Sequence, residues 1–445
     1  MFHKILIANR GEIAVRIIRA CKEMGISTVA VYSQADRDAL HASLADESYC
    51  IGGNRVSESY LNITAILSVA ELTGASAIHP GYGLLAENAK FASLCEKCNI
   101  KFIGPSAEVI AKMGDKDQAR SIMKKAGIPI VEGSDGVADE NEALKIAKKA
   151  GFPVLIKARC GGGGKGIRLV EKEEDFKKAF AYATAEAQAA FSDGAVYVEK
   201  FLHPVKHIEV QLICDDYNNI VCLGERDCSI QRNNQKIIEE SPSIFLDAYT
   251  RKKMFDDAIN AAKAVGYRGV GTIEFLVDSQ GDYYFMEMNT RLQVEHPVTE
   301  MVTGIDLVKW QIRVAAGKEL AFSQKDINFF GHAIECRINA ENPYKNFMPS
   351  AGKITLLHIP GGPWVRFDSA LYQDYFVPPY YDSMIGKLIV HAATREEAIR
   401  KMKASLCELV IEGIDHNKDF LMDILSHPKF EDGTYTTDLV AGGIR

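Results

Sequence analysis

Residues 284–300 read YFMEMNTRLQVEHPVTE, and this stretch decides how the rest of the chain is interpreted. An apolar run over residues 283–286 leads into Glu287, Asn289 and Arg291, which are spaced two residues apart. Because alternate side chains of a β-strand point the same way, these three would share one strand face. Oxygen ligands beside a guanidinium predict a place where a metal ion, a phosphate and a small anion meet. A sheet edge with scattered charges is the alternative.

The composition is that of an ordinary globular protein with several domains. The chain has 445 residues, 47% of them hydrophobic and 25% charged, which favours two or three domains. The net charge is −7 without a basic block, so we expect no nucleic-acid partner. No apolar run approaches the roughly 18–20 residues that span a bilayer, so we expect no membrane contact. Charged residues interrupt the N-terminal apolar stretch too early for a signal peptide, and we expect a cytoplasmic location.

The first hundred residues alternate short β-branched runs with amphipathic stretches of helical period. This alternation predicts βαβ units and a parallel sheet. Strands are expected over residues 4–8, 28–32, 77–79 and 101–103, and helices over 12–24, 61–73 and 86–98. A dinucleotide-binding domain is the rival interpretation, but the first turn, residues 8–12, carries one glycine where that fingerprint needs three. We therefore exclude a nicotinamide cofactor.

A glycine loop follows the predicted strand 153–158. Residues 161–166 read GGGGKG, and Lys157 ends the strand before them. Consecutive glycines let backbone N–H groups approach phosphate oxygens closely. No Ser or Thr follows the Gly-Lys pair, and a strand rather than a helix is expected next, so this is not a Walker A loop. The pattern favours a flap that closes over a nucleotide, with a plain surface hairpin as the alternative.

Two further groups of polar residues surround a predicted hairpin at 278–282. Glu274 lies on the strand before the turn and Glu287 and Asn289 on the strand after it, so pairing would bring their oxygens together. Such a set suits Mg²⁺ bound to a triphosphate. The second group is cationic and polar and suits a small carboxylate-like substrate, with Glu295 as a base among cations. It comprises Lys236, Arg291, Gln293, Glu295 and, on a later strand, Arg337.

Several motifs in order resemble the biotin carboxylase family of the ATP-grasp superfamily. They are HPGYG at 79–83, MGDK at 113–116, the glycine loop, ERDCSIQ at 225–231, the stretch 287–300 and ECRIN at 335–339. The resemblance implies an α/β and α+β multidomain fold. Its parts would be an N-terminal parallel α/β domain (1–113), an ATP-grasp domain (114–330) with a mobile glycine-loop lid at about 131–203, and a C-terminal mixed α/β domain (331–445). The implied activity is carboxylation of biotin N1′ with ATP and bicarbonate, through carboxyphosphate.

The resemblance also assigns roles to individual positions. ATP contacts fall on Lys116, Lys157, Gly163, Gly164, the hinge Glu199, Lys200, Phe201 and Leu202, and His207, Gln231, Asn234 and Leu276. Glu274, Glu287 and Asn289 match the Mg²⁺ or Mn²⁺ ligands. Lys236, Arg291, Gln293 and Val294 match the bicarbonate pocket, and Glu295 matches the base that deprotonates bicarbonate. Arg337 matches the group that stabilises biotin enolate, and Tyr82 lies on a loop near biotin.

Two positions depart from the commonest family pattern. Asn234 stands where many members carry histidine, and Lys165 replaces an arginine in the glycine loop. Both changes are expected to tune ATP affinity rather than to remove activity, because Asn still hydrogen-bonds a phosphate. The chain lacks an Ala-Met-Lys-Met-like turn for covalent biotin, so biotin is expected on a separate carrier protein.

The resemblance favours the biotin carboxylase subunit of acetyl-CoA carboxylase, which supplies malonyl-CoA for fatty acid synthesis. Its implied partners are a biotin carboxyl carrier protein, carboxyltransferase subunits and a second copy of the chain. The same half-reaction serving propionyl-CoA or pyruvate carboxylase stays open, as does another ATP-grasp ligase. A non-catalytic ATP-binding regulator is disfavoured because Glu274, Glu287 and Glu295 are all present.

Overall fold

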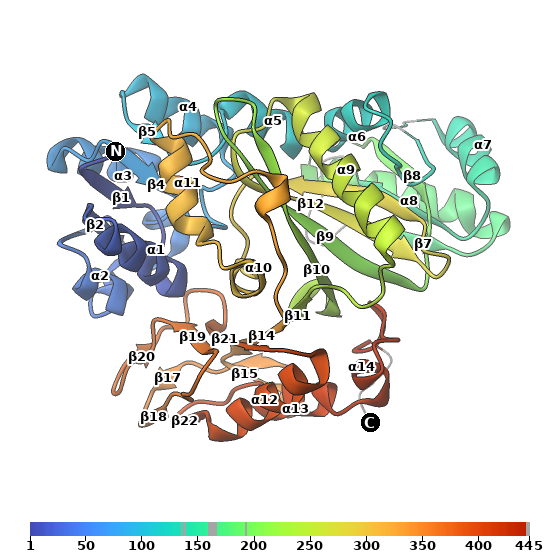
Figure 1. Ribbon diagram of the computed structural model, residues 1–445. Coiled ribbons are helices and arrows are strands. Elements are labelled where there is room, and N and C mark those ends of the chain that lie inside the picture. Colours follow the sequence, from blue (N-terminus) through green and yellow to red (C-terminus); the bar gives the residue numbers. More distant parts are fainter. Residues whose placement is uncertain (135–136, 138, 159–166, 192–193, 442–445) are drawn as a thin grey trace.

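The computed structural model describes residues 1–134, 137, 139–158, 167–191 and 194–441, which form the three parts visible in Figure 1. The N-terminal part is built on a five-stranded sheet in the order β3-β2-β1-β4-β5, and all its pairings are parallel, as predicted. Its elements are β1 (Lys4–Ile7), α1 (Gly11–Glu23), β2 (Ser27–Tyr32), α2 (Leu40–Leu44), β3 (Glu47–Cys50), α3 (Ile63–Thr73), β4 (Ala77–His79), α4 (Ala89–Lys97), β5 (Lys101–Phe102) and α5 (Ala107–Gly114). Asn62, Asn88 and Ser106 cap the helices that follow them by accepting a backbone N–H.

A small separate layer follows the N-terminal part in the chain. It is a three-stranded sheet in the order β7-β6-β8 with two helices packed on it, and Phe176, Val154 and Val198 lie in its core. Its elements are α7 (Glu140–Ala150), β6 (Val154–Ala158), β7 (Ile167–Val170), α8 (Glu173–Phe191) and β8 (Val196–Lys200), and α6 (Lys116–Lys125) precedes them. This confirms the strands predicted on either side of the glycine loop, while the loop itself, residues 159–166, lies outside the described residues.

The largest sheet has eight antiparallel strands in the order β13-β12-β9-β10-β11-β14-β21-β19, and it continues across residue 330. Its strands are β9 (Val205–Cys214), β10 (Ile220–Arg232), β11 (Gln235–Ser241), β12 (Gly269–Asp278), β13 (Tyr283–Asn289), β14 (His332–Asn339), β19 (Val365–Ser369) and β21 (Met384–Ala392). The helices around it are α9 (Ala248–Val265), α10 (His296–Thr303), α11 (Leu307–Ala315) and α12 (Arg395–Glu408). The C-terminal part, orange to red in Figure 1, therefore shares this sheet with the central part of the chain, which contributes β9 to β13.

Short elements complete the C-terminal part. They are β15 (Glu341–Asn342), β16 (Met348–Pro349), β17 (Gly352–Lys353), β18 (Leu356–His358), β20 (Phe376–Val377), β22 (Val410–Glu412), α13 (Lys418–Leu425) and α14 (Pro428–Glu431). The strands among them pair only in two-stranded antiparallel ladders, β15 with β16, β17 with β20 and β18 with β22.

Two of the β-bulges in this sheet lie where the polar residues gather. Ile237 is an extra residue in β11, because Gln231 pairs with Lys236 while the next pair along is Ile230 with Ile238. Met286 is an extra residue in β13, where Glu274 faces Glu287 and Phe275 faces Phe285. Each bulge reverses the alternation of side chains in its strand, so residues three apart in β11 reach the same face.

The hairpin between β10 and β11 is turned by two asparagines. Asn233 and Asn234 have φ angles of 50° and 63°, the left-handed values that a two-residue hairpin with a type I′ turn requires. Asparagine tolerates this backbone better than most residues. The Asn234 noted as a departure from the family pattern therefore also serves the turn.

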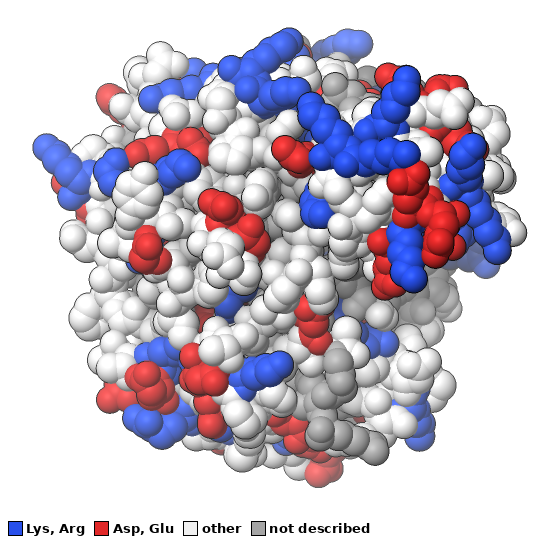
Figure 2. All heavy atoms as spheres, turned by 90° about the vertical axis from the view of Figure 1, so that its right-hand side faces the viewer, with Lys and Arg blue, Asp and Glu red and all other residues white. Residues whose placement is uncertain are grey.

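The surface carries charges of both signs. Figure 2 shows Lys and Arg next to Asp and Glu on the face that bears α7 and α8, with a group of Lys and Arg toward the top. Ion pairs such as Lys148–Glu173 at 2.7 Å and Lys177–Glu140 at 3.3 Å lie on these exposed elements. Within the described residues, the structure contains no helix with the length and apolar character that crossing a bilayer demands.

Candidate active site

A cleft of about 1980 Å³ lies between the three parts. Nearly all residues predicted to act on ATP, metal, bicarbonate or biotin line it. They are Tyr82, Lys116, Lys157, Glu199, Lys200, Phe201, Leu202, His207, Gln231, Asn234, Lys236, Glu274, Leu276, Glu287, Asn289, Arg291, Gln293, Val294, Glu295 and Arg337. The predicted Gly163 and Gly164, and Lys165, lie outside the described residues.

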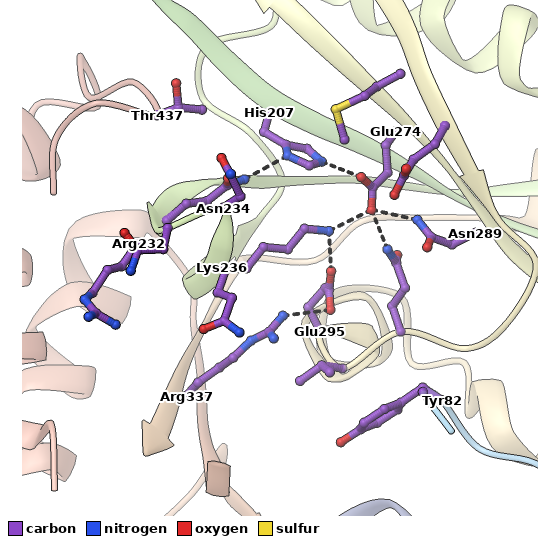
Figure 3. Close-up of a pocket in the computed structure, with 18 of the residues that line it drawn as sticks. Tyr82, His207, Arg232, Asn234, Lys236, Glu274, Asn289, Glu295, Arg337 and Thr437 are labelled. Atoms are coloured by element: carbon purple, nitrogen blue, oxygen red, sulfur yellow. Dashed lines mark hydrogen bonds and ion pairs between the residues drawn. The ribbon is translucent and has the colours of Figure 1, made fainter. Parts of the chain in front are cut away.

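Glu295 lies between two cations at the centre of the cleft. Its Oε1 accepts from Lys236 Nζ at 2.7 Å and its Oε2 from Arg337 Nη2 at 3.0 Å, as Figure 3 shows. Burial raises the pKa of this carboxyl, but Lys236 and Arg337 outweigh burial and hold the pKa below its ordinary value. Glu295 is therefore an ionised carboxylate poised beside an anion pocket, which suits a base.

Lys236 is shared among three carboxylates. Its Nζ lies 2.5 Å from Glu209, 2.9 Å from Glu274 and 2.7 Å from Glu295. Burial opposes the charge on Lys236, but the three acids hold its pKa well above the ordinary value. This ammonium is therefore protonated, and its three N–H groups are all accepted by carboxylates, so an anion entering the cleft would replace one of them.

Glu274 and Glu287 face each other across the β12–β13 ladder, and this pair was predicted to hold a metal. Glu274 also accepts from Asn289 Nδ2 at 2.7 Å and lies 2.9 Å from His207 Nε2. The Glu287 side chain is exposed within the open cleft; partial desolvation by the cleft walls and repulsion from Glu274 raise its pKa above the ordinary value. A hard divalent cation between the carboxylates would relieve this repulsion, so the donor set fits Mg²⁺ or Mn²⁺.

Arg291 corrects one prediction from the sequence. Strand β13 ends at Asn289, so Arg291 lies beyond it and does not share a strand face with Glu287 and Asn289. Its Nη2 nevertheless donates to Asn289 Oδ1 at 2.9 Å, and its Nε donates to Glu87 at 2.9 Å. Glu87 comes from the N-terminal part and was not predicted from the sequence; it anchors Arg291 at the edge of the cleft.

The opposite end of the cleft holds the predicted nucleotide residues. Lys157 Nζ and Arg120 Nη1 both donate to Glu199, at 2.6 and 2.9 Å, and so join α6, β6 and β8. His207 receives Gln231 Nε2 on its Nδ1 at 2.8 Å and presents its other nitrogen to Glu274. The C-terminal segment at Thr437, labelled in Figure 3, donates its backbone N–H to the Val205 carbonyl at the start of β9; it also lines this end and was not predicted.

Tyr82 and Val294 are placed by residues from distant parts of the chain. The Tyr82 hydroxyl donates to the Glu12 carboxylate on α1. The buried Lys387 on β21 donates to the Val294 carbonyl at 2.7 Å and lies 3.2 Å from Glu12. These contacts tie the Tyr82 loop and the segment before α10 to one rigid support.

Arg226 is a buried arginine that binds several polar side chains around the site, a role that was not predicted from the sequence. It is completely buried, and its guanidinium donates to Glu209, Gln211 and Gln293 at 2.6 Å each. It thereby orients Glu209 toward Lys236 and Gln293 toward Glu274, to which Gln293 Nε2 donates at 2.8 Å. The motif ERDCSIQ around Arg226 is visible in the sequence, but the contacts of Arg226 depend on the pairing of β9, β10 and β12.

Comparison with known proteins covers almost the whole chain. Family models match as follows: the biotin carboxylase N-terminal domain over residues 1–110, the carbamoyl-phosphate synthase L chain ATP-binding domain over 115–323, and the biotin carboxylase C-terminal domain over 335–442. Biotin carboxylase 1 of Bacillus subtilis (strain 168) is 58% identical over 439 residues, 98% of each chain. One of the pyruvate carboxylase subunits of Methanothermobacter thermautotrophicus is 53% identical over 441 residues, 99% of this chain and 90% of the relative.

A solved structure matches equally well. The biotin carboxylase domain dimer of Hydrogenobacter thermophilus 2-oxoglutarate carboxylase, in complex with MgADP, ADP and bicarbonate, superposes with a TM-score of 0.94. It is 50% identical, and the match covers 99% of this chain and 98% of that one.

Proposed function

The chain belongs to the biotin carboxylase family, and on that premise we propose that it performs the first half-reaction of acetyl-CoA carboxylase. It is an ATP-dependent ligase that carboxylates biotin with ATP and bicarbonate. The observation that carries the proposal is the ionised Glu295 held between Lys236 and Arg337, in the same cleft as the Glu274–Glu287 pair. A base for bicarbonate and a metal site for ATP thus lie side by side.

We assign the anion end of the cleft to bicarbonate. Lys236 and Arg291 bind its charge, and Glu295 accepts its proton. A bicarbonate oxygen then attacks the γ-phosphorus, the bond from that phosphorus to ADP breaks, and carboxyphosphate results. The bond between the carboxyl carbon and the phosphate oxygen then breaks and releases inorganic phosphate, which takes the N1′ proton of biotin. N1′ bonds to the carboxyl carbon, and Arg337 lies where it would face the charge that develops on the biotin ring.

The metal site falls to Glu274, Glu287 and Asn289. A divalent cation bound there would neutralise charge on the triphosphate during phosphoryl transfer. The chain's own contribution is to keep both carboxylates opposite each other, through the β12–β13 register and the bulge at Met286. The Asn289 amide, which bonds both Glu274 and Arg291, links the metal residues to the bicarbonate residues.

We assign acetyl-CoA as the final acceptor, with biotin delivered on a separate carrier protein and passed to carboxyltransferase subunits. The support is a full-length match to a stand-alone biotin carboxylase. Pyruvate is the second candidate, because a pyruvate carboxylase subunit is 53% identical over 99% of the chain. A homodimer in the cytoplasm completes the proposal; the Hydrogenobacter thermophilus relative is a dimer.

The decisive experiment measures ATP hydrolysis with Mg²⁺, bicarbonate and free biotin. We expect biotin to stimulate hydrolysis and Glu295→Gln to abolish the stimulation while ADP still binds. An enzyme that binds ATP but shows no stimulation by biotin would refute the proposal. Affinity purification from the source cells then tests the acceptor: an acetyl-CoA carboxyltransferase partner supports the first candidate, and a pyruvate-specific one supports the second.

A further inference from the structure

Two buried glutamates face each other directly behind Arg337. Glu239 on β11 and Glu335 on β14 are register partners in the antiparallel ladder, and neither side chain is exposed. Directly opposed residues in such a ladder have Cβ atoms about 5 Å apart on the same face of the sheet. The two side chains therefore leave the sheet next to each other, in a region closed to bulk solvent.

Three of their four oxygens lack a donor within the part of the chain that the structure describes. No N–H or O–H group among the described residues donates to Glu239 Oε2 or to either oxygen of Glu335. Buried polar atoms without partners are rare, and two ionised carboxylates on adjacent strands in a buried region would repel each other. A single proton held between them would satisfy oxygens on both residues and remove the repulsion.

The remaining oxygen of Glu239 is bound to Arg337. Glu239 Oε1 accepts from Arg337 Nε at 2.7 Å and lies 2.5 Å from Nη2, and the same Nη2 reaches Glu295 at 3.0 Å. Arg337 therefore bridges the buried pair and the base in the cleft. The bulge at Ile237 makes this possible, because it brings Glu239 to the same face as Lys236.

The charged and titratable groups around the pair come from every packed element. They are Cys228 on β10, Lys236 on β11, Glu295 before α10, Cys336 and Arg337 on β14, Lys387 on β21, and Tyr82 from the N-terminal part. Burial raises the pKa of Glu239 to about 7 even though Arg337 opposes the shift. Burial also raises the pKa of Glu335 well above its ordinary value, against the effect of Lys387.

We propose that Glu239 and Glu335 share one proton and together act as a positioning pair that holds Arg337 against Glu295. The inference rests on the proposed function, in which Arg337 faces biotin. With one proton, the pair carries one negative charge and matches one guanidinium. Loss of that proton draws Arg337 toward two anions and away from Glu295, and gain of a second proton releases it from Glu239.

Two isosteric variants of the pair have distinct expected outcomes. In Glu335→Gln the amide N–H₂ donates to Glu239 at every pH, so the biotin-dependent rate near pH 7 stays within about twofold of wild type. Its alkaline decline, measured from pH 7 to 9, becomes weaker than in wild type. In Glu239→Gln the anionic anchor is lost, and kcat/KM for biotin falls roughly tenfold while the Kd for ADP is unchanged.

Glu240→Gln is the matched control, because Glu240 is equally buried on the same strand but binds His332 and Arg395 on the other side. It is expected to lower the melting temperature without changing the pH profile or the KM for biotin. A Glu335→Gln profile identical to wild type, together with an unchanged biotin kcat/KM in Glu239→Gln, would overturn the positioning pair. Wild-type enzyme without any biotin-stimulated hydrolysis would instead overturn the proposed function, so the two failures are distinguishable.

Discussion

Glu239 and Glu240 are neighbours on β11 and both are fully buried, yet their surroundings differ in kind. Glu240 accepts from Arg395 Nε at 2.7 Å, lies 2.7 Å from His332 Nε2 and also accepts from the Tyr435 hydroxyl. Glu239 keeps one oxygen for which no described group is a donor. Burial raises the pKa of both, but His332 and Arg395 reverse the shift for Glu240 alone.

The difference distinguishes an acid that stabilises the fold from an acid near the reacting groups on the same strand. The side of β11 that carries Glu240 joins the sheet to α12 and the C-terminal segment, and Glu240 there is saturated with donors. The other side faces the cleft, where Lys236 and Arg337 are shared among more acids than they can neutralise. Incomplete pairing in a buried site is costly, so its presence here indicates a functional requirement.

The largest effect is expected from Lys236→Met, which removes the cation common to three acids on the cleft side. The pKa of Glu295 should rise, and the anion pocket loses its ammonium, so biotin-dependent ATP hydrolysis should fall about 10³-fold. Steady-state kinetics with saturating biotin measure the change. Lys252→Met is the matched control, because its pair with Asp256 lies on the exposed face of α9. Activity above a tenth of wild type in Lys236→Met would contradict the role of Lys236.

The second largest effect is a loss of stability on the side of β11 where Glu240 is saturated with hydrogen-bond donors. Glu240→Ala leaves Arg395 and His332 buried without their acid, and the free energy of unfolding should fall by about 3–5 kcal/mol. Chemical denaturation of the ligand-free protein measures the loss. The folded fraction should keep the wild-type KM for biotin. A raised KM with unchanged stability would place Glu240 in the mechanism and erase the distinction between the two sides.

The sequence predicts the regular part of this arrangement well. Periodicity located the parallel N-terminal sheet, and the β12–β13 hairpin with Glu274 opposite Glu287 followed from turn residues between two strands. The resemblance to a family selected residues that do line one cleft. These features depend on local pattern and on motifs, both of which are visible in the chain itself.

The contacts that complete the site depend on register and could not be predicted from the sequence. The bulge at Ile237 decides that Glu239, and not Glu240, reaches Arg337, and only strand pairing reveals it. Glu87 reaches Arg291 from about two hundred positions away. The end of β13 at Asn289 likewise removes Arg291 from the strand face on which alternation had placed it.

A third test compares how Glu239 and Glu240, on the two sides of β11, make stability depend on pH. Glu239 has a pKa of about 7 in the folded protein and about 4.5 when unfolded, so the folded state holds the extra proton between these values. The unfavourable contribution of Glu239 to the free energy of unfolding therefore grows as pH rises from 4.5, and it is fully present above pH 7. Glu239→Gln lacks this unfavourable contribution. Its free energy of unfolding should exceed that of wild type by on the order of 1–3 kcal/mol at pH 8, but by little at pH 4.5.

Glu240 should behave with the opposite sign. The pKa of its carboxyl is lowered on folding, so its contribution is present above the unfolded pKa and disappears as pH falls. Glu240→Gln should accordingly lose most stability at neutral pH and approach wild type in acid. Urea midpoints measured from pH 4.5 to 8 check both curves. Parallel curves for the two variants would show that the two sides of β11 are electrostatically equivalent.

The smallest effect is expected at Glu87, an acid intermediate between the two extremes. Its side chain is 40% exposed, yet it accepts from Arg291 Nε at 2.9 Å and from the Thr290 backbone N–H at 3.0 Å. Because water screens such a pair, Glu87→Gln should lower the free energy of unfolding by about 1 kcal/mol or less. It should also raise the KM for bicarbonate a few-fold. Glu186→Gln is the control, since its pair with Arg168 at 3.1 Å is similarly exposed but lies away from the cleft. An equal change in both variants would mean that Glu87 acts only through surface charge, and no change in bicarbonate KM would mean that Arg291 needs no anchor.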